Sequence, residues 1–330
     1  MGVKNWDFVP WRWVPYDEFR PRSMAIDAPN YLTRRVQAFE YQAKLSIERI
    51  PTAQISLAFS TIRSSLAMKI LPVFVFDGPP ENLKRPSNPS LLQAASLLYH
   101  QFSESHNIND ARIAEQLVES RALRWYFAVN YLKDLCNAIG VPQVTAPSEA
   151  EMMAAVMCRE SLVGTVLSND LDALLFGSPH VTRTIQFGNG LIERCTLKDL
   201  QESVDLPLDY LRDLAIICGC DFHRDGVKGV GPRKGVVLLQ RYGGLVGLLR
   251  SKGYSKSEIE GYVNARSMFE EANYISLNGV ITNLNPPLVP KLIHLLEPII
   301  GQENAERQSN HILKLWKDFG KEQTTLEQWV

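Results

Sequence analysis

The chain has 330 residues, of which 45% are hydrophobic and 22% charged, and this composition excludes a wholly disordered protein. Its formal net charge of −1 lacks the basic excess common in nucleic-acid-binding proteins, although a local basic surface can still steer a polyanion. No stretch predicts a membrane span, and the five cysteines show neither zinc spacing nor an even disulfide set. We expect one large domain or two, in a reducing intracellular compartment.

Short apolar segments alternate with helical segments through much of the chain. Strands are predicted at residues 24–27, 71–78, 141–145 and 163–167, and helices at 55–68 and 150–160. Such alternation indicates an α/β fold with a mainly parallel sheet, in which binding sites form beyond the carboxyl ends of the strands.

Residues 81–140 leave this alternation and predict a helical insertion between sheet strands. Its helices are expected at 91–102 and 113–138, with a polar turn between them. Two more short strands are predicted at 181–187 and 191–195, and the chain is expected to be helical after them.

Two acidic pairs, Glu149/Glu151 and Asp170/Asp172, stand about twenty residues apart at the ends of adjacent predicted elements. Carboxylates brought together repel each other unless cations neutralise them, and a set of oxygen ligands favours Mg²⁺ or Mn²⁺ over zinc. Helix capping is the alternative for each pair. Ser148 and Glu151 have the spacing of a capping box, and Asp170 could cap the helix that follows it.

Three further acids share this placement. Asp27 and Asp77 end predicted strands, and Asp221 follows a predicted helix. Hydrolysis of a phosphodiester by two metal ions needs such a cluster, because carboxylates hold the ions that activate water and stabilise the leaving oxygen. Seven acids cannot all contact two ions directly, so some would act through bound water.

A glycine-punctuated segment forms the second signal: Gly226-Val227-Lys228-Gly229-Val230-Gly231-Pro232-Arg233-Lys234, followed by an apolar helix at 236–239. Such a turn directs backbone N–H groups at a phosphate, and its three basic residues add charge. Recognition of this kind ignores base sequence and weakens with salt. The segment lacks the Gly-Lys-Ser/Thr ending of a Walker A loop. The alternative is an ordinary corner between two helices.

Five motifs together carry a family resemblance. They are Val-Phe-Val-Phe-Asp-Gly-Pro-Pro, Ala-Pro-Ser-Glu-Ala-Glu, Ser-Asn-Asp-Leu-Asp-Ala-Leu-Leu-Phe-Gly, Gly-Cys-Asp-Phe and the glycine segment. In this order and spacing they resemble the flap endonucleases, XPG-type structure-specific 5′ nucleases, and most of all the compact archaeal members. The resemblance implies a mainly parallel central sheet flanked by helices, the PIN-like 5′-nuclease fold.

The resemblance also implies a division of the chain. A nuclease core would span residues 1–240, with a helical arch at about 81–138 and a helix–two-turn–helix module at about 214–240. A helical part at 241–320 would pack on the core, and a tail at 321–330 would bind the sliding clamp, PCNA.

The resemblance assigns roles to site residues. All seven acids would bind metal, as two Mg²⁺ per active site with Mn²⁺ as a substitute. Lys84 would be the catalytic lysine at the base of the arch, where a cation stabilises developing phosphate charge, with Arg85 beside it; a solvated basic pair is the alternative. Gly2 falls on the family's N-terminal glycine, whose amine lies near the site once Met1 is removed. The glycine segment would grip duplex DNA and bind K⁺.

The last eight residues look like an exposed tail and are similar to the clamp-binding peptide of these enzymes. Gln323, Leu326 and Trp329 have the spacing of one helical turn that inserts into a pocket, and Val330 replaces the usual second aromatic residue.

The chain departs from the family pattern in its arch and near its first Asp. Leu91 stands where the family carries a second basic residue, and Thr33 stands at the base-stacking tyrosine, with Tyr31 the nearest aromatic residue. Arg121 and Arg124 could compensate by binding DNA in the arch, and a solvated helix face is the alternative.

We therefore expect a monomeric, metal-dependent 5′ flap endonuclease, with 5′–3′ exonuclease activity, acting in DNA replication and repair. Metal-activated water would attack the phosphodiester directly, without a covalent intermediate, and 5′-flap DNA would be selected by shape. The cytoplasm of an archaeal cell is the expected location, or the nucleus of a eukaryotic one.

Two alternatives remain open. The arch region, residues 84–134, carries only six Lys/Arg against five Asp/Glu, which motivates an XPG-type paralogue that prefers bubbles, gaps or four-way junctions. The other is a non-catalytic scaffold that binds DNA or the clamp.

Overall fold

The computed structural model describes residues 6–18, 21–33, 50, 52–79 and 88–327, with side chains described up to residue 320. Two compact units interleave along the chain. The first unit consists of Met1–Pro21 and Pro147–Gly279, and the second of Arg22–Ala146 and Val280–Val330. The sequence predicts consecutive parts, so this interleaving is a new finding.

Four strands of the first unit are described. They are β1 (Arg12–Pro15), β5 (Thr165–Leu167), β6 (His180–Gln186) and β7 (Leu191–Thr196), in the order β1-β7-β6-β5. β5 pairs with β6 in parallel, with Val166 opposite Val181, whereas β7 is antiparallel to both its neighbours.

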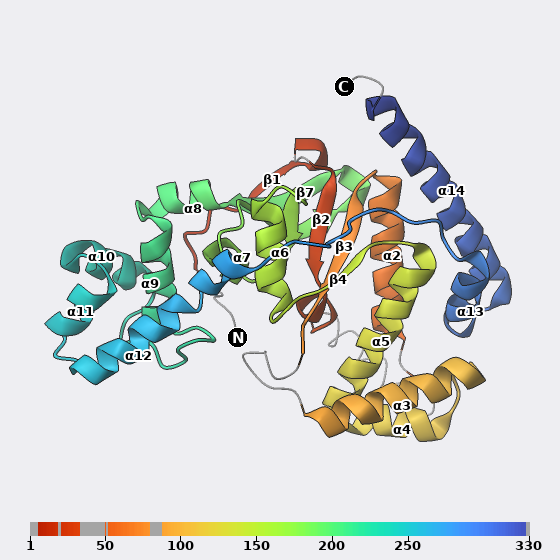
Figure 1. The fold of residues 1–330 in the computed structure, drawn as a ribbon, viewed down its shortest axis with the longest axis horizontal. Helices are drawn as coiled ribbons and strands as arrows, with labels where there is room; N and C mark the ends of the chain where they lie inside the picture. The colour runs from red at the N-terminus through yellow and green to blue at the C-terminus, as the bar shows by residue number, and fades with distance from the viewer. Residues whose placement is uncertain (1–5, 19–20, 34–49, 51, 80–87, 328–330) are drawn as a thin grey trace. The chain divides into compact units, whose positions relative to one another are not determined.

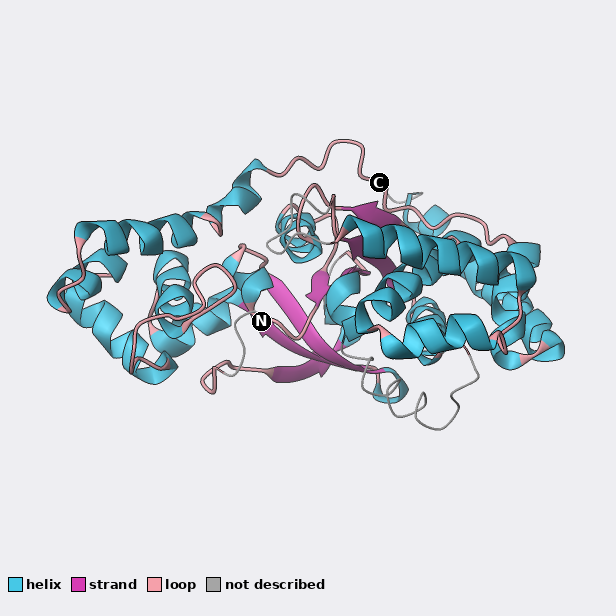
Figure 2. Cartoon of the chain, turned by 90° about the horizontal axis from the view of Figure 1, so that it is seen from below, coloured by secondary structure: helices cyan, strands magenta, loops and turns pink. Residues whose placement is uncertain are grey.

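Helices dominate the rest of the first unit. They are α6 (Ala150–Arg159), α7 (Asp172–Leu175), α8 (Leu197–Val204), α9 (Leu208–Cys218), α10 (Pro232–Tyr242), α11 (Leu245–Ser251) and α12 (Lys256–Ser267), with short 3₁₀ turns η1 (Tyr16–Glu18), η3 (Phe187–Asn189) and η4 (Glu270–Tyr274). Figure 2 shows α9–α12, on the left in both views, as a group of helices without a strand among them.

The second unit contains three parallel strands in the order β2-β3-β4. They are β2 (Ser23–Asp27), β3 (Leu71–Phe76) and β4 (Gln143–Thr145). Every residue of β2 and β3 is buried, as expected of parallel strands covered on both faces, and this explains why their sequences are continuous apolar runs.

The helices of this unit with described bounds are α2 (Ala53–Ala67), α3 (Pro89–Ser105), α4 (Ala111–Glu119), α5 (Arg121–Ile139), α13 (Val289–Ile300) and α14 (Gln302–Glu327), and residues 28–33 after β2 are also helical. α14 packs on α13 and α2, and α13 also packs on α5, so the C-terminal helices cover helices from much earlier in the sequence (Figure 1). Three of the five described strand pairings are parallel, and the predicted mainly parallel α/β fold is confirmed.

Some element bounds differ from the prediction. The helix expected at 113–138 breaks in two at Ser120, whose hydroxyl accepts the N–H of Leu123 and caps α5. β1 was not predicted. The helix after the glycine segment begins at Pro232 rather than Val236, because a proline at the first helical position needs no N–H partner. Among the helices described here, none has the length and apolar character needed to cross a bilayer.

Candidate functional site

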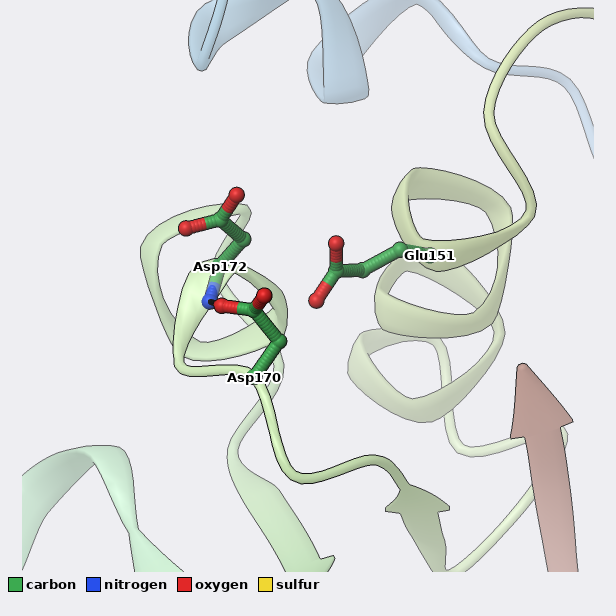
Figure 3. Close-up of side chains that lie close together, drawn as sticks. All are labelled: Glu151, Asp170 and Asp172. Carbon is green, nitrogen blue, oxygen red and sulfur yellow. Dashed lines mark hydrogen bonds between the residues drawn. The ribbon is translucent and has the colours of Figure 1, made fainter. Parts of the chain in front are cut away.

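Three of the predicted acids meet in the first unit. Glu151 lies in the first turn of α6, Asp170 in the loop after β5, and Asp172 at the start of α7. One carboxylate oxygen from each lies within 4.8 Å of the other two. Figure 3 shows Glu151 pointing from its helix toward the two aspartates.

The loop after β5 positions both aspartates through its own hydrogen bonds. Asp170 N–H donates to Ser168 Oγ at 3.1 Å, and Asp172 N–H donates to Asp170 Oδ1 at 3.3 Å (Figure 3). The predicted capping role of Asp170 is wrong in position, because Leu171 is the N-cap of α7 and α7 has no side-chain cap. Asp170 still accepts the amide of Asp172, and the same residue belongs to the acidic group.

The predicted capping box of Ser148 and Glu151 is wrong. Glu149 is the N-cap of α6, and its side chain makes no capping hydrogen bond there. Glu151 extends toward Asp170 and Asp172 instead of folding back over the helix end (Figure 3). This orientation favours a ligand role for Glu151 over a purely local one.

Burial makes this acidic group suited to a hard cation. Asp170 is 5% exposed and Asp172 is 1% exposed. Charged carboxylates this close and this buried are costly without a neutralising partner, and oxygen-only donors match Mg²⁺ or Mn²⁺. Glu151, Asp170 and Asp172 therefore fit a divalent ion.

Two other predicted acids, Asp27 and Asp77, belong to the second unit. β2 and β3 are parallel neighbours, Asp27 pairs with Val75, and Asp77 follows β3 directly. Asp27 and Asp77 therefore both lie at the carboxyl ends of adjacent strands, with Asp77 two residues beyond the residue opposite Asp27. Asp27 is 4% exposed, and its Oδ1 accepts the N–H of Asn30 at 3.0 Å.

Glu149 and Asp221 belong to the first unit but lie outside the group of Glu151, Asp170 and Asp172. Glu149 is half-buried at the start of α6, and Asp221 is half-buried in the turn after α9. The structure thus brings three of the seven acids together and places two others at the ends of adjacent strands in the second unit.

The glycine segment forms a tight corner between α9 and α10. Gly226 has φ +56°, and a Cβ there would meet Ile217 O at 2.6 Å and Gly219 N at 2.7 Å. Tyr262 donates its hydroxyl hydrogen to Gly226 O at 2.6 Å, which fixes the corner from α12. Gly231 is the N-cap of α10, as a phosphate-facing helix start requires.

The basic residues of this segment reach the surface. Lys228, Arg233 and Lys234 are all exposed. Arg233 Nε lies 2.7 Å from Asp7 Oδ2, and Lys234 Nζ donates to Gly229 O at 3.1 Å. Because exposed ion pairs contribute little stability, Arg233 can exchange Asp7 for a phosphate at small cost.

Two predicted DNA contacts are corrected by the structure. Tyr31 is 3% exposed, its hydroxyl donates to Thr61 Oγ1 at 2.7 Å, and its ring packs edge-on against Phe74. This ring lies in the core and is not placed to stack on a base. Arg124 is 7% exposed, and its Nη1 donates to the carbonyls of Leu117 and Val118, so it closes the end of α4 rather than facing DNA.

The remaining candidates are less fully described. Arg121 is the exposed first residue of α5, which suits either a solvated face or a phosphate contact. The backbone of Gln323 and Leu326 belongs to α14, so the predicted tail continues a helix through Glu327. Outside the described residues lie Gly2, Lys84, Arg85, Trp329 and Val330.

Two family models match parts of this chain. The model of the XPG N-terminal domain matches residues 5–90, and that of the XPG I-region matches residues 140–221, together slightly more than half of the chain. The chain belongs to the XPG family.

Similar proteins span the whole of this XPG-family chain. Flap endonuclease 1 of Methanococcus aeolicus is 26% identical and that of Methanocaldococcus jannaschii 27% identical, with at least 99% of each protein covered. The solved flap endonuclease-1 from Methanococcus jannaschii has a TM-score of 0.69 at 26% identity and covers 96% of this chain and 99% of its own. Human GEN1 with Holliday junction DNA has a TM-score of 0.66 at 18% identity, covering 96% of this chain and 78% of its own, a likeness of fold alone.

Sequence reasoning missed one group of residues in this XPG-family chain. Trp125, Tyr126 and Lys133 of α5 line a pocket next to Asp77. Burial lowers the pKa of Lys133, and the charge of Asp77 acts in the opposite direction. The sequence feature that could have revealed this group is the eight-residue spacing of Trp125 and Lys133, which places both side chains on the same side of a helix.

Proposed function

We propose that this chain is a Mg²⁺-dependent, structure-specific 5′ flap endonuclease that hydrolyses DNA phosphodiesters at flap junctions, with 5′–3′ exonuclease activity. The observation that carries the proposal is the group of Glu151, Asp170 and Asp172, three carboxylates supplied by α6, the loop after β5 and α7, with both aspartates buried. Its relatives named flap endonuclease 1 support the choice of substrate.

All seven predicted acids would hold the ions, directly or through water. Two Mg²⁺ ions, or Mn²⁺ in their place, would supply an activated water and stabilise the leaving oxygen. This chain's own part is to fix the ligands: the loop hydrogen bonds orient Asp170 and Asp172, and the parallel register places Val75, two residues before Asp77, opposite Asp27. Lys84 would stabilise charge on the scissile phosphate, and the Gly2 amine would lie near the site.

The corner at residues 226–234 would hold the duplex through its phosphates. Gly231 opens the N-terminus of α10, and Lys228, Arg233 and Lys234 surround it with positive charge. Backbone carbonyls at this corner would supply the oxygen ligands that suit K⁺. Residues 321–330 would bind the sliding clamp, with the nuclease a monomer in the cytoplasm or nucleus.

A paralogue that prefers bubbles, gaps or junctions is the second candidate, favoured by the composition of the arch. Of the two arginines offered as substitutes for its missing cations, Arg124 is committed to α4 carbonyls. Threading a single strand through such an arch would gain little electrostatic help.

A panel of branched DNAs at equal concentration tests the proposal. Double flaps, bubbles, gapped duplexes and four-way junctions would be compared in Mg²⁺ by initial rate and by cut position. Fastest cutting of the double flap at its junction supports the flap endonuclease. Preference for another branch favours the paralogue, and DNA binding without any cutting favours a scaffold.

A further inference from the structure

A pocket of about 160 Å³ lies in the second unit beside Asp77, between α3 and α5. Helix α3 contributes Leu92 and Ser96, and the end of β3 contributes Phe76 and Gly78. The wall from α5 consists of Trp125, Tyr126, Val129, Asn130 and Lys133. Because the predicted metal ligand Asp77 borders this pocket, whatever binds there would lie next to the reaction site.

Three aromatic residues line the pocket, and two of them, Trp125 and Tyr126, are neighbours on α5. The ring centroids of Trp125 and Tyr126 are 4.8 Å apart, with planes at 77°. Two apolar surfaces at nearly a right angle can hold a flat molecule by its face and its edge. Both side chains are half-buried, so they are anchored in the helix packing and still reachable from solvent. Unpaired nucleobases are commonly bound by stacking on such rings.

Polar groups complete the lining in a way that fits a nucleotide. Asn130 Nδ2 donates to Ser96 Oγ at 3.4 Å, which joins α5 to α3 along the pocket. Amide and hydroxyl groups can bond the edge of a base. Lys133 Nζ lies 5.0 Å from the centroid of the Phe76 ring, at the Asp77 end of the pocket. A cation beside an aromatic wall matches the two parts of a nucleotide, its phosphate and its base.

We propose that this pocket binds the unpaired nucleotide next to the scissile phosphate, with its base stacked on Trp125 and a phosphate contacting Lys133. The inference rests on the proposed nuclease function. Trp125 and Lys133 are then specificity-determining residues for single-stranded ends.

Two double-flap DNAs test the proposal. They differ only at the first unpaired nucleotide, which carries a base in one and lacks the base in the other. Wild type should cleave the abasic flap about 5- to 150-fold more slowly under subsaturating conditions, the range expected for one stacked base. Trp125→Ala should cleave the normal flap as slowly as wild type cleaves the abasic flap. Removal of the base should not lower the cleavage rate of Trp125→Ala any further. Equal cleavage of both DNAs by wild type overturns the proposal without any variant.

Controls separate stacking from folding. Trp125→Phe keeps a ring and should retain most of the discrimination. Tyr274→Ala removes an aromatic side chain that is 87% exposed and outside the pocket, and should discriminate as wild type does. Trp125→Ala should match wild type on the abasic flap, which a misfolded protein could not do. A Trp125→Ala enzyme that still discriminates as strongly as wild type contradicts the proposal.

A binding measurement distinguishes failure of the pocket from failure of the nuclease function. A fluorescent 2-aminopurine at the same nucleotide should be quenched when wild type binds the flap, and should stay bright with Trp125→Ala. If wild type cuts no flap, the proposed function fails, and quenching alone then decides the pocket: loss of quenching in Trp125→Ala supports it, and unchanged fluorescence with wild type overturns it.

Discussion

Replacement of Gly226 by alanine should disrupt the corner between α9 and α10 far more than the same change at Gly229. Both glycines have positive φ, +56° and +74°, so each alanine carries the left-handed strain of about 1–2 kcal/mol. At Gly229 a new Cβ meets nothing within 4 Å. At Gly226 it would lie 2.6 Å from Ile217 O and 2.7 Å from Gly219 N, and backbone atoms cannot rotate away.

The expected magnitudes follow from these contacts. Overpacking adds about 1–3 kcal/mol to Gly226→Ala, and displacement of Gly226 O from the Tyr262 hydroxyl adds roughly 1 kcal/mol. The total is about 3–6 kcal/mol, against about 1–2 kcal/mol for Gly229→Ala. Urea denaturation followed by circular dichroism measures both in one experiment. Equal losses in the two variants, or a Gly226→Ala loss below about 1 kcal/mol, would refute the close approach described for this corner.

Three other predictions each concern one side chain or segment. Arg124→Ala should lower the free energy of unfolding by about 2 kcal/mol, measured by thermal unfolding, because two α4 carbonyls lose a charged donor. Arg121→Ala should change it by less than about 0.5 kcal/mol, and a larger loss for Arg121→Ala than for Arg124→Ala would contradict the role given to Arg124. Lys228→Ala should weaken duplex binding equally for all sequences and reduce the salt slope by about 1, and an unchanged slope would remove Lys228 from the DNA surface. Deletion of residues 321–330 should abolish co-elution with the sliding clamp while leaving cleavage of a free flap intact; retained co-elution would place the clamp contact elsewhere.

Strands with a single strong signal could be predicted from the sequence. β3 is buried over all six residues, so its sequence, Leu-Pro-Val-Phe-Val-Phe, is a continuous apolar run. β1, Arg12–Pro15, has mostly exposed residues and ends in proline. Among the described pairings it pairs with β7 alone, and it is the edge strand of the sheet on that side. Edge pairing of this kind depends on a distant partner, and a local pattern does not reveal it.

In the second unit, the sequence did not predict where one helix ends and the next begins, nor which polar side chains are buried. Periodicity continued through Ser120, but its backbone is extended and its hydroxyl accepts the N–H of Leu123, which separates α4 from α5. Tyr31 and Arg124 have side chains that suit DNA binding, but tertiary contacts place both in the interior. Their burial depends on partners far along the chain or on the bend between two helices, which sequence spacing does not encode.

The acidic group was more accessible to sequence reasoning. Because the ends of parallel strands meet at one edge of a sheet, the placement of Asp27 and Asp77 at the ends of parallel strands could be predicted from the strand pattern alone. Glu151 lies in the first turn of α6, so its approach to Asp170 and Asp172 depends on the packing of α6 against α7. The aromatic pocket on α5 was missed because Trp125 and Lys133 look like members of an ordinary amphipathic helix.

Cleavage of an end-labelled double-flap DNA in Mg²⁺, with wild type beside Asp172→Asn, tests the central claim most directly. Asp172 is 1% exposed and lies within 4.8 Å of the other two ligand oxygens, so the amide should lower the cleavage rate by about 100-fold or more while the protein stays folded. We predict one incision at the junction or one nucleotide inside it, lost in the variant. Cleavage by Asp172→Asn at the wild-type rate, or no incision of the flap by wild type, would contradict the account.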